Sequence, residues 1–248
     1  MKKVFILILA LCLSLPSFAS CGGEKLTLRV GTYNIKNGGN VDYDMSVIAA
    51  DIVACDLDIV GLQEVDMKTK RCGGIDTLKL LAEAAGYEYY EFAKAIDYQG
   101  GEYGTAIMSR YPITSFEVTK LPTNKDMEGR ALGHAVIDVD GKNIDFFNTH
   151  LSYEDKAVIK KQFKQLNNKV NKSNTFIITA DFNTNDDSNY ELIQKSIRAN
   201  NNEFNTYSNK SAIDDIILCK KWNIIDKGMQ DVSGHSDHNL FWAEIQYK

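Results

Sequence analysis

The middle of the chain, from Tyr87 to Leu151, consists of β-rich segments that follow one another without a helical segment between them. Gly, Pro and Asn/Asp residues separate these segments, which is typical of strands joined by hairpins. The segments are YEYYEFAKAI, YGTAIMSRYPI, ITSFEVTKL, RALGHAVIDV and KNIDFFNTHL. So many consecutive strands do not fit an open doubly wound sheet, in which helices separate the strands. No other feature of the sequence restricts the fold as much.

Helical and β-rich segments alternate on both sides of this meander. Before it, alternation predicts a strand at 26–35, a mostly apolar run predicts a second strand at 57–65, and helical spacing predicts amphipathic helices at 45–56 and 75–87. After it, we expect a lysine-rich helix at 154–170, a strand at 174–182, a shorter helix at 190–199, and strands at 212–219, 222–229 and 239–246. Such an order suits two packed sheets covered on the outside by helices. The predicted fold class is therefore an α/β sandwich.

The first twenty residues have the pattern of an export signal. Lys2 and Lys3 precede the apolar run VFILILALCLSL, and small residues follow before Cys21. The run is too short for a good transmembrane helix. Either cleavage after Ala19 releases a soluble product, or lipoprotein processing acylates Cys21 and anchors the protein to a membrane. We favour the lipoprotein, which predicts export across the inner membrane to the cell envelope; the alternative is a periplasmic or secreted protein.

The rest of the chain, residues 25–248, is expected to form a single domain. It contains no seam rich in Pro, Gly and Ser, and apolar residues are spread evenly along it. The chain is acidic, with a formal net charge of −5. Loss of the two leader lysines makes it more acidic still. Acidity disfavours a nucleic acid partner bound through a broad basic surface, although a local basic groove around Lys36, Lys68, Lys70 and Arg71 remains compatible with it.

Three cysteines follow Cys21, at positions 55, 72 and 219. Their spacing does not match a metal site. One pair could form a disulfide in an oxidising envelope, and buried free thiols are an equally good interpretation.

Polar side chains recur where the expected strands end or begin. Taken singly, each has an ordinary structural interpretation as a turn residue, a helix cap or a hydrogen-bonded histidine. If neighbouring strands deliver their ends to one rim, however, these side chains converge. They are Asn34, Gln63, Glu64, Asn148, His150, Asp181, Asn183, Asp214, Asp237 and His238.

This set contains the groups that hydrolysis of a phosphoric ester requires. Glu64, with Asn34 and Asp237, can hold a hard cation such as Mg²⁺. Asp181 is a candidate base for an attacking water, and Asn183 can place the water or the phosphate. A carboxylate beside a histidine fixes its tautomer and raises its pKa, and Asp214 with His238 is the natural pair. The chain has no GxSxG or HExxH motif that would indicate another kind of hydrolase.

Seven short stretches, spread over nearly the whole mature chain, are similar to motifs of the endonuclease/exonuclease/phosphatase superfamily of metal-dependent hydrolases. They are TYNI at 32–35, LQEVD at 62–66, YGTAIMSRYPI at 103–113, NTHL at 148–151, ADFN at 180–183, AIDDII at 212–217 and SDH at 236–238. One such stretch would be weak, but seven in the family's order are specific. The resemblance implies a four-layered αββα sandwich of two mixed or antiparallel β-sheets flanked by helices, with Mg²⁺ or Mn²⁺ as cofactor.

The resemblance also implies roles for individual residues. Asn34, Glu64 and Asp237 match metal-binding positions, and the matching catalytic positions are His150, Asp181, Asn183, Asp214 and His238. Arg71, Tyr103 and Arg130 fall near the site, where they would bind the substrate; a surface charge or a packed sheet residue is an equally good interpretation of each. His235 has no counterpart, and we expect it to be a solvated loop residue.

Three functional hypotheses follow. The first is an exported hydrolase of phosphoric esters, a phosphodiesterase or phosphatase, whose substrate is a phosphoester of unknown identity. The second is an exported nuclease, which the acidic charge and the lack of a long basic, aromatic-laced segment disfavour. The third is a surface lipoprotein that binds a ligand without catalysis.

Overall fold

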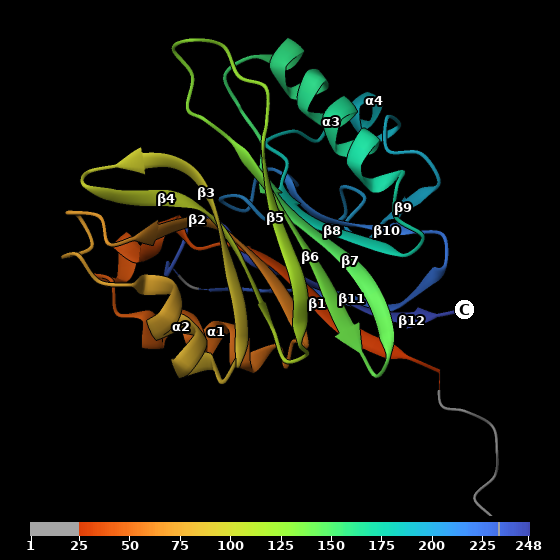
Figure 1. The fold of residues 1–248 in the computed structure, drawn as a ribbon, viewed down its shortest axis with the longest axis horizontal. Helices are drawn as coiled ribbons and strands as arrows, with labels where there is room; N and C mark the ends of the chain where they lie inside the picture. The colour runs from red at the N-terminus through yellow and green to blue at the C-terminus, as the bar shows by residue number, and fades with distance from the viewer. Residues whose placement is uncertain (1–24, 233) are drawn as a thin grey trace, which may run out of the picture.

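A computed structural model of the protein describes residues 25–232 and 234–248. The predicted export signal and Cys21 lie outside these residues. Within the described residues, the chain forms two six-stranded β-sheets that face each other (Figure 1). The first sheet contains, in spatial order, β11 (Trp222–Gln230), β12 (Leu240–Tyr247), β1 (Thr27–Asn34), β2 (Ile59–Met67), β4 (Gly101–Ser109) and β3 (Tyr89–Tyr98). The second contains β5 (Ile113–Lys120), β6 (Ala131–Val139), β7 (Lys142–His150), β8 (Phe176–Asp181), β10 (Asp214–Cys219) and β9 (Ser196–Arg198).

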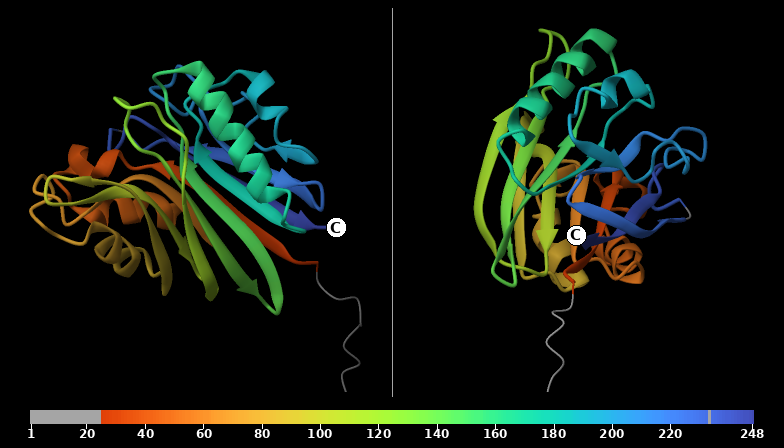
Figure 2. Two further views of the ribbon diagram at one scale, coloured as in Figure 1. Left: turned by 45° about the horizontal axis from the view of Figure 1, so that its top comes forward. Right: turned by 90° about the vertical axis from the view of Figure 1, so that its right-hand side faces the viewer.

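Helices cover the outer faces of both sheets. On the first sheet lie α1 (Met45–Ala54) and α2 (Thr77–Ala85), preceded in the chain by the 3-10 turn η1 (Lys36–Val41); on the second lie α3 (Lys156–Val170) and the short α4 (Asp187–Tyr190). Figure 2 shows the two helix pairs on opposite sides of the facing sheets. This arrangement confirms the predicted four-layered αββα sandwich. No helix in the described part of the chain is both long enough and apolar enough to span a bilayer.

Local sequence explains where these helices begin and end. Aspartate side chains cap their N-termini: Asp44 accepts from the backbone of Ser46, Asp76 from that of Lys79, and Asp155 from that of Ala157. Gly86 ends α2 with a left-handed backbone, φ +77°, which suits a residue without a Cβ. The apolar faces of the helices then pack on the sheets, and burial of these faces supplies most of their stability.

A buried polar network joins the two sheets beneath the strand ends. Asn148 of β7 accepts from Gln63 Nε2 at 2.7 Å and from Thr179 Oγ1 at 3.1 Å, and its own amide donates to the carbonyl oxygens of Leu62 and Ala106. Each hydrogen-bonding atom of the Asn148 side chain therefore has a partner on another strand. Satisfied in this way, the network fixes how the sheets sit against each other.

Gly61 lies opposite this network, and no larger residue fits there. A Cβ on Gly61 would overlap Thr179 Oγ1 and lie 2.6 Å from Asn148 Oδ1. We expect Gly61→Ala to lower the free energy of unfolding by about 3 kcal/mol, because overpacking and the broken network both destabilise the fold. Urea unfolding of Gly61→Ala, Thr179→Ala and the double variant measures the effect. Since Thr179→Ala removes the overlapping atom, the double variant should be more stable than the sum of the single effects predicts; strict additivity would contradict this explanation.

Two sequence-based expectations are resolved by the fold. The helix predicted at 190–199 is wrong: α4 ends at Tyr190, and Ser196–Arg198 form the edge strand β9 because they pair with β10. Non-local strand pairing overrides the local helical pattern there. Cys55, Cys72 and Cys219 are buried and, within the described residues, form no disulfide, so the free-thiol interpretation holds.

Candidate active site

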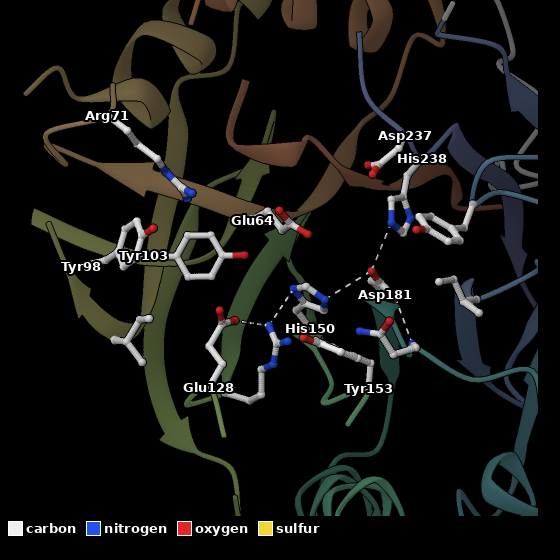
Figure 3. A pocket seen from close by; sticks show the side chains of 15 residues that line it. Glu64, Arg71, Tyr98, Tyr103, Glu128, His150, Tyr153, Asp181, Asp237 and His238 are labelled. Carbon is white, nitrogen blue, oxygen red and sulfur yellow. Dashed lines mark hydrogen bonds and ion pairs between the residues drawn. The ribbon is translucent and has the colours of Figure 1, made fainter. Parts of the chain in front are cut away.

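One cavity of about 520 Å³ opens at the rim where strand ends from both sheets meet (Figure 3). Its walls are formed by Glu64, Arg71, Ile96, Tyr98, Tyr103, Glu128, Arg130, His150, Tyr153, Asp181, Asn183, Tyr207, Ile213, Asp237 and His238. Strand register explains the convergence. The parallel pair β7–β8 aligns His150 with Asp181, and the antiparallel pair β8–β10 aligns Asp181 with Asp214.

Asp181 lies at the centre of the site, and only 1 % of its surface is exposed. Its Oδ2 accepts from Asn34 Nδ2 at 3.0 Å and lies 3.4 Å from His150 Nε2 and 3.6 Å from His238 Nε2. Figure 3 shows the two imidazoles on either side of this carboxylate. Its Oδ1 accepts from the backbone N–H of Asn183 at 2.9 Å. These contacts hold the carboxylate in one orientation at the cavity wall.

His150 is a neutral imidazole whose tautomer is set by Arg130. Arg130 Nη1 lies 3.0 Å from His150 Nδ1, and a guanidinium can only donate, so Nδ1 carries a lone pair. The proton therefore sits on Nε2, which faces Asp181. Burial, then the charges of Arg130 and His238, lower the pKa of His150 well below its usual value. His150 thus presents an N–H donor to the cavity without a positive charge.

His238 is the opposite case, an imidazolium held by an acid. Its Nδ1 lies 2.8 Å from Asp214 Oδ2, which also accepts from the Thr206 hydroxyl. Burial alone would lower the pKa of His238, but the carboxylates of Asp214 and Asp181 outweigh it and raise that pKa to about 10. Both ring nitrogens then carry protons at neutral pH, and Nε2 faces the cavity.

Asp181 itself is poised near neutrality. Burial, together with the Asp214 carboxylate, raises its pKa to about 7, against the opposing effects of His238 and the hydrogen bonds from Asn34 and Asn183. A carboxylate with this pKa removes a proton from water far better than an exposed aspartate does, because its conjugate acid is weaker. The arrangement can therefore activate a water molecule next to two N–H donors.

Glu64 faces the cavity because of a bulge in β2. The pairing of β2 with β4 shifts register between Leu62 and Val65, and Glu64 adopts a left-handed backbone with φ +57°. Such bulges redirect side chains and are common beside functional sites. Gln63 consequently points into the network between the sheets, while Glu64 Oε1 accepts from Asn34 Nδ2 at 3.0 Å.

Asn34 does not itself line the cavity but contacts two carboxylates that do, and its predicted role as a metal ligand stays a prediction. Its side-chain amide donates to both Glu64 and Asp181, and its Oδ1 accepts from the backbone N–H of Lys36 at 3.0 Å. Reversing the amide would lose all three hydrogen bonds. In this structure, Asn34 orients the two carboxylates.

The remaining predicted residues also lie at the cavity or against it. Asn183, with φ +52°, anchors its amide nitrogen on the Leu151 carbonyl at 2.8 Å, and Asp237 pairs with Lys36 at 3.0 Å. Asp214 does not line the cavity but contacts it through His238. Asp237 and Glu64 enter from different segments, the loop before β12 and the bulge of β2, and both carboxylates face the cavity (Figure 3).

The donor set fits a hard divalent cation. Carboxylates outnumber cationic groups in and directly around the cavity. The carboxylates are those of Glu64, Asp66, Glu128, Asp181, Asp214 and Asp237, and the cationic groups are those of Lys36, Arg71, Arg130 and His238. A phosphate would be repelled by this excess unless a cation offset it. Oxygen donors of Glu64 and Asp237 are those that Mg²⁺ and Mn²⁺ prefer. A second group of possible ligand atoms, one each from Asp181, Asp214 and His238, lies within 4.8 Å of one another. This group suits a cation less well, because Asp214 is already hydrogen-bonded to His238 and a protonated His238 repels a cation.

The three residues predicted to bind substrate all line the cavity, and both arginines have carboxylate partners. Arg71 donates through Nε and Nη2 to Asp66 at 2.6 and 2.8 Å, and Arg130 pairs with Glu128 at 2.6 Å while only 4 % exposed. Tyr103 is also nearly buried. Lys68 and Lys70, proposed as part of a basic groove, do not line the cavity.

Sequence reasoning missed several wall residues. Tyr98 and Glu128 come from β3 and the loop before β6, Tyr153 follows β7, and the Tyr207 ring lies 4.8 Å from that of His238. Glu128 had a local signal, the stretch EGR that contains Arg130. The tyrosines had none, because an aromatic residue at a strand end or in a loop is also typical of ordinary packing.

The side chain of His235, which the sequence predicted to be solvated, is 35 % exposed and has a carboxylate partner. Its Nδ1 lies 3.0 Å from Asp51 Oδ2 of α1, which also accepts from the Tyr33 hydroxyl at 3.2 Å. Ser236 Oγ donates to the Asn34 carbonyl at 2.7 Å. These contacts tie the loop that carries Asp237 and His238 to α1 and to the end of β1.

Comparison with known families gives one match. A family described as "Endonuclease/Exonuclease/phosphatase family" matches residues 31–238, which include every predicted site residue. No sequence among curated proteins matches the chain.

Solved structures share the fold. A protein titled endonuclease/exonuclease/phosphatase from Beutenbergia cavernae superposes with a TM-score of 0.75 at 22% identity, covering 89% of this chain and 72% of that one. A mannosyl-6-phosphatase of Bacteroides thetaiotaomicron gives 0.69 at 20% identity, with 88% and 99% covered. D. rerio TDP2, in complex with a single-strand DNA product, gives 0.69 at 18% identity, with 88% and 98% covered.

Proposed function

Because this chain belongs to the endonuclease/exonuclease/phosphatase family, we propose that it hydrolyses a phosphoric ester with water, assisted by Mg²⁺ or Mn²⁺, after export from the cytoplasm. One observation carries the proposal. A buried carboxylate with a pKa near neutrality, Asp181, lies between a neutral and a protonated imidazole and shares its cavity with Glu64. A ligand-binding protein without catalysis has no need for such a group.

The side chains divide the reaction among them. Asp181 takes a proton from the attacking water, and Asn183 helps to place that water or the phosphate. His238, as an imidazolium, and His150, through Nε2–H, donate to the phosphoryl oxygens, where charge accumulates. Glu64 and Asp237 would hold the divalent cation, which when bound neutralises charge on the phosphate. Asn34 and Asp214, which do not line the cavity, and Arg130, which does, each orient a group that faces it.

Two of the structural relatives point to different substrates. The Bacteroides protein is a phosphatase of a sugar phosphate, and TDP2 holds a DNA product. Charge favours the first class for this chain. Its net charge is −5, and two cations of the predicted basic groove, Lys36 and Arg71, are each paired with a carboxylate. Little free positive charge remains near the cavity for neighbouring phosphates of a strand.

A test of the proposal uses the mature protein with p-nitrophenyl phosphate, bis-p-nitrophenyl phosphate and an oligonucleotide. We expect turnover of at least one nitrophenyl ester with Mg²⁺ or Mn²⁺, and EDTA should lower it at least about 100-fold, since the ion supplies several kcal/mol of charge stabilisation. The melting temperature should fall by less than about 3 °C, which corresponds to roughly 1 kcal/mol, because the sandwich has a large core of its own. No turnover of any ester with either ion would contradict the proposal, and equal loss of activity and stability would indicate a structural ion.

We further propose that Cys21 carries a lipid anchor and that the cavity faces away from the membrane. Thr27 and Asn34 lie at opposite ends of β1, about 25 Å apart for eight extended residues, and the cavity is at the Asn34 end. This position suits a soluble substrate better than a lipid of the anchoring membrane. Cell fractionation checks the anchor: wild type should sediment with membranes and Cys21→Ser should not. A wild type found only in the soluble fraction would contradict it.

A further inference from the structure

The cavity has a second half, beside the phosphate-handling groups, that the proposed reaction leaves without a role. We call it the leaving-group pocket and define it by Arg71, Ile96, Tyr98, Tyr103 and Glu128. Figure 3 shows Arg71, Tyr98, Tyr103 and Glu128 on the side of the cavity away from Asp181 and His238, with Glu64 and His150 in between. The chemistry of this half determines what is attached to the phosphate.

Arg71 is held rigidly and its charge is neutralised. The fully buried carboxylate of Asp66 accepts hydrogen bonds from two guanidinium nitrogens of Arg71, at 2.6 and 2.8 Å. Asp66 is itself fixed by a hydrogen bond from the Thr69 hydroxyl at 2.8 Å. The guanidinium lies 4.7 Å from the Tyr98 ring centroid and 5.5 Å from that of Tyr103. Its third nitrogen, Nη1, has no hydrogen-bond partner among the described residues. Arg71 therefore offers a fixed N–H donor in an aromatic wall, without a free positive charge.

Glu128 offers the complementary acceptor. One oxygen, Oε1, pairs with Arg130 at 2.6 Å, and the second, Oε2, has no partner within the described part of the chain. Burial raises the pKa of Glu128, and the positive charge of Arg130 offsets part of this rise. When ionised, this carboxylate repels phosphate and can only accept, so the groups that suit it are hydroxyls or other neutral donors.

Two ion pairs thus leave the leaving-group pocket without net positive charge. Arg71 is matched by Asp66, and Arg130 by Glu128. A second phosphate would lie next to Glu128 Oε2, a carboxylate oxygen without a cationic partner among the described residues, and would be repelled by it. A bisphosphate or a nucleic acid strand is therefore disfavoured there. Ile96 and the rings of Tyr98 and Tyr103 supply an apolar surface for one face of a ring, as is typical of small-molecule sites.

We propose that the leaving-group pocket binds a neutral, hydroxyl-bearing group, so that the substrate is the monophosphate of a sugar or a polyol. This proposal rests on the proposed function, because it assumes that a phosphoric ester occupies the other half of the cavity. The hydroxyls donate to Glu128 and accept from Arg71 Nη1, and the carbon skeleton packs on the tyrosines. Water then displaces the sugar or polyol alcohol, which takes up one proton as the P–O bond to it breaks, and inorganic phosphate remains.

The experiment compares kcat/KM for a hexose 6-phosphate, glycerol 3-phosphate, a hexose 1,6-bisphosphate and p-nitrophenyl phosphate, which has no hydroxyl on its leaving group. For wild type, kcat/KM for hexose 6-phosphate or for glycerol 3-phosphate should exceed that for the bisphosphate by at least about tenfold. A preference for the hexose ester indicates a sugar leaving group, and a preference for the glycerol ester indicates a short polyol. In Glu128→Gln, the ratio of kcat/KM for the preferred substrate over p-nitrophenyl phosphate should fall about 10- to 100-fold, the range expected for a hydrogen bond to a charged group. The control is Glu117→Gln. Glu117 lies on β5 outside the cavity and pairs with Lys169, so this variant should leave the ratio unchanged.

The possible outcomes separate the two proposals. If wild type hydrolyses none of these esters and no bis-p-nitrophenyl phosphate either, the proposed function itself fails. Turnover of bis-p-nitrophenyl phosphate alone refutes only the leaving-group pocket. If it hydrolyses p-nitrophenyl phosphate but prefers the bisphosphate or an oligonucleotide, only the leaving-group pocket is refuted. If Glu128→Gln lowers kcat/KM equally for the preferred substrate and for p-nitrophenyl phosphate, Glu128 only holds Arg130 in place, and the proposal is overturned. Should Glu128→Gln not fold, Glu128→Asp keeps the charge beside Arg130 but withdraws the carboxylate by one methylene, and the same ratio decides.

Discussion

Asp181→Asn is expected to lower kcat about 10³-fold, because it removes the group that takes the proton from water. It should also change the pH profile. In wild type, the base form of Asp181 predominates above its pKa of about 7, so log kcat/KM should rise with pH and level off above about pH 7. A bound cation would shift this limb to lower pH. His238, with a pKa near 10, stays protonated across this range. The residual activity of Asp181→Asn should lack the acid limb.

Stability provides the control for this variant. The pKa of Asp181 in the folded protein is above the usual 3.8, so its ionisation opposes folding from about pH 4 upward, and the full effect is present above pH 7. Asn removes the charge, and urea unfolding at pH 8 should therefore find Asp181→Asn at least as stable as wild type. Asp145→Asn is a matched variant: Asp145 pairs with His134 at 2.7 Å on the same sheet, outside the cavity, and kcat should not change. An Asp181→Asn protein that keeps wild-type kcat and its acid limb would remove the central assignment.

Glu64→Gln is expected to abolish activation by Mg²⁺ and to lower kcat/KM about 10³-fold, since the lost charge weakens cation binding and the transition state loses several kcal/mol of charge stabilisation. The amide keeps the shape of the side chain and can still contact Asn34, so the fold should be retained. Activity measured against Mg²⁺ concentration, together with calorimetric titration of the ion, separates weaker binding from slower chemistry.

Glu102→Gln is the matched control for Glu64. It lies on β4, the neighbouring strand, and pairs with Lys94 at 2.7 Å outside the cavity. Its Mg²⁺ dependence should equal that of wild type. If Glu64→Gln had an unchanged half-saturating Mg²⁺ concentration, the cation would have to bind elsewhere, and the cluster of Asp181, Asp214 and His238 would become the candidate.

Much of the fold was predictable because its signals are local. Alternation with period two marked the strands, helical spacing marked α1, α2 and α3, and the meander from Tyr87 to Leu151 required hairpins, as the pairing of β3 with β4 and of β5, β6 and β7 confirms. The polar strand ends were visible for the same reason. Parallel and antiparallel register then brought His150, Asp181 and Asp214 side by side.

Prediction failed where a contact joins residues far apart in sequence. Ser196–Arg198 were predicted as helix because their pairing with β10 leaves no local trace. The partner of His235, Asp51, lies 184 residues away, so the loop sequence alone indicated a solvated side chain. The hydrogen bond between Arg130 and His150 was also missed, because it depends on the register of β6 against β7, while the predicted contact of Arg130 with substrate stays a prediction.

By itself, the sequence determined all the longer strands and helices, which family the motifs resemble and which polar residues stand at the strand ends. Only the tertiary structure decided the states of those residues: His150 neutral because Arg130 donates to it, His238 charged because Asp214 holds it, and Asn34 turned toward two carboxylates. The physical reason is distance. Secondary structure follows from periodicities of a few residues, whereas a pKa or a tautomer depends on burial and on charges within a few ångströms, which come together only when distant segments pack.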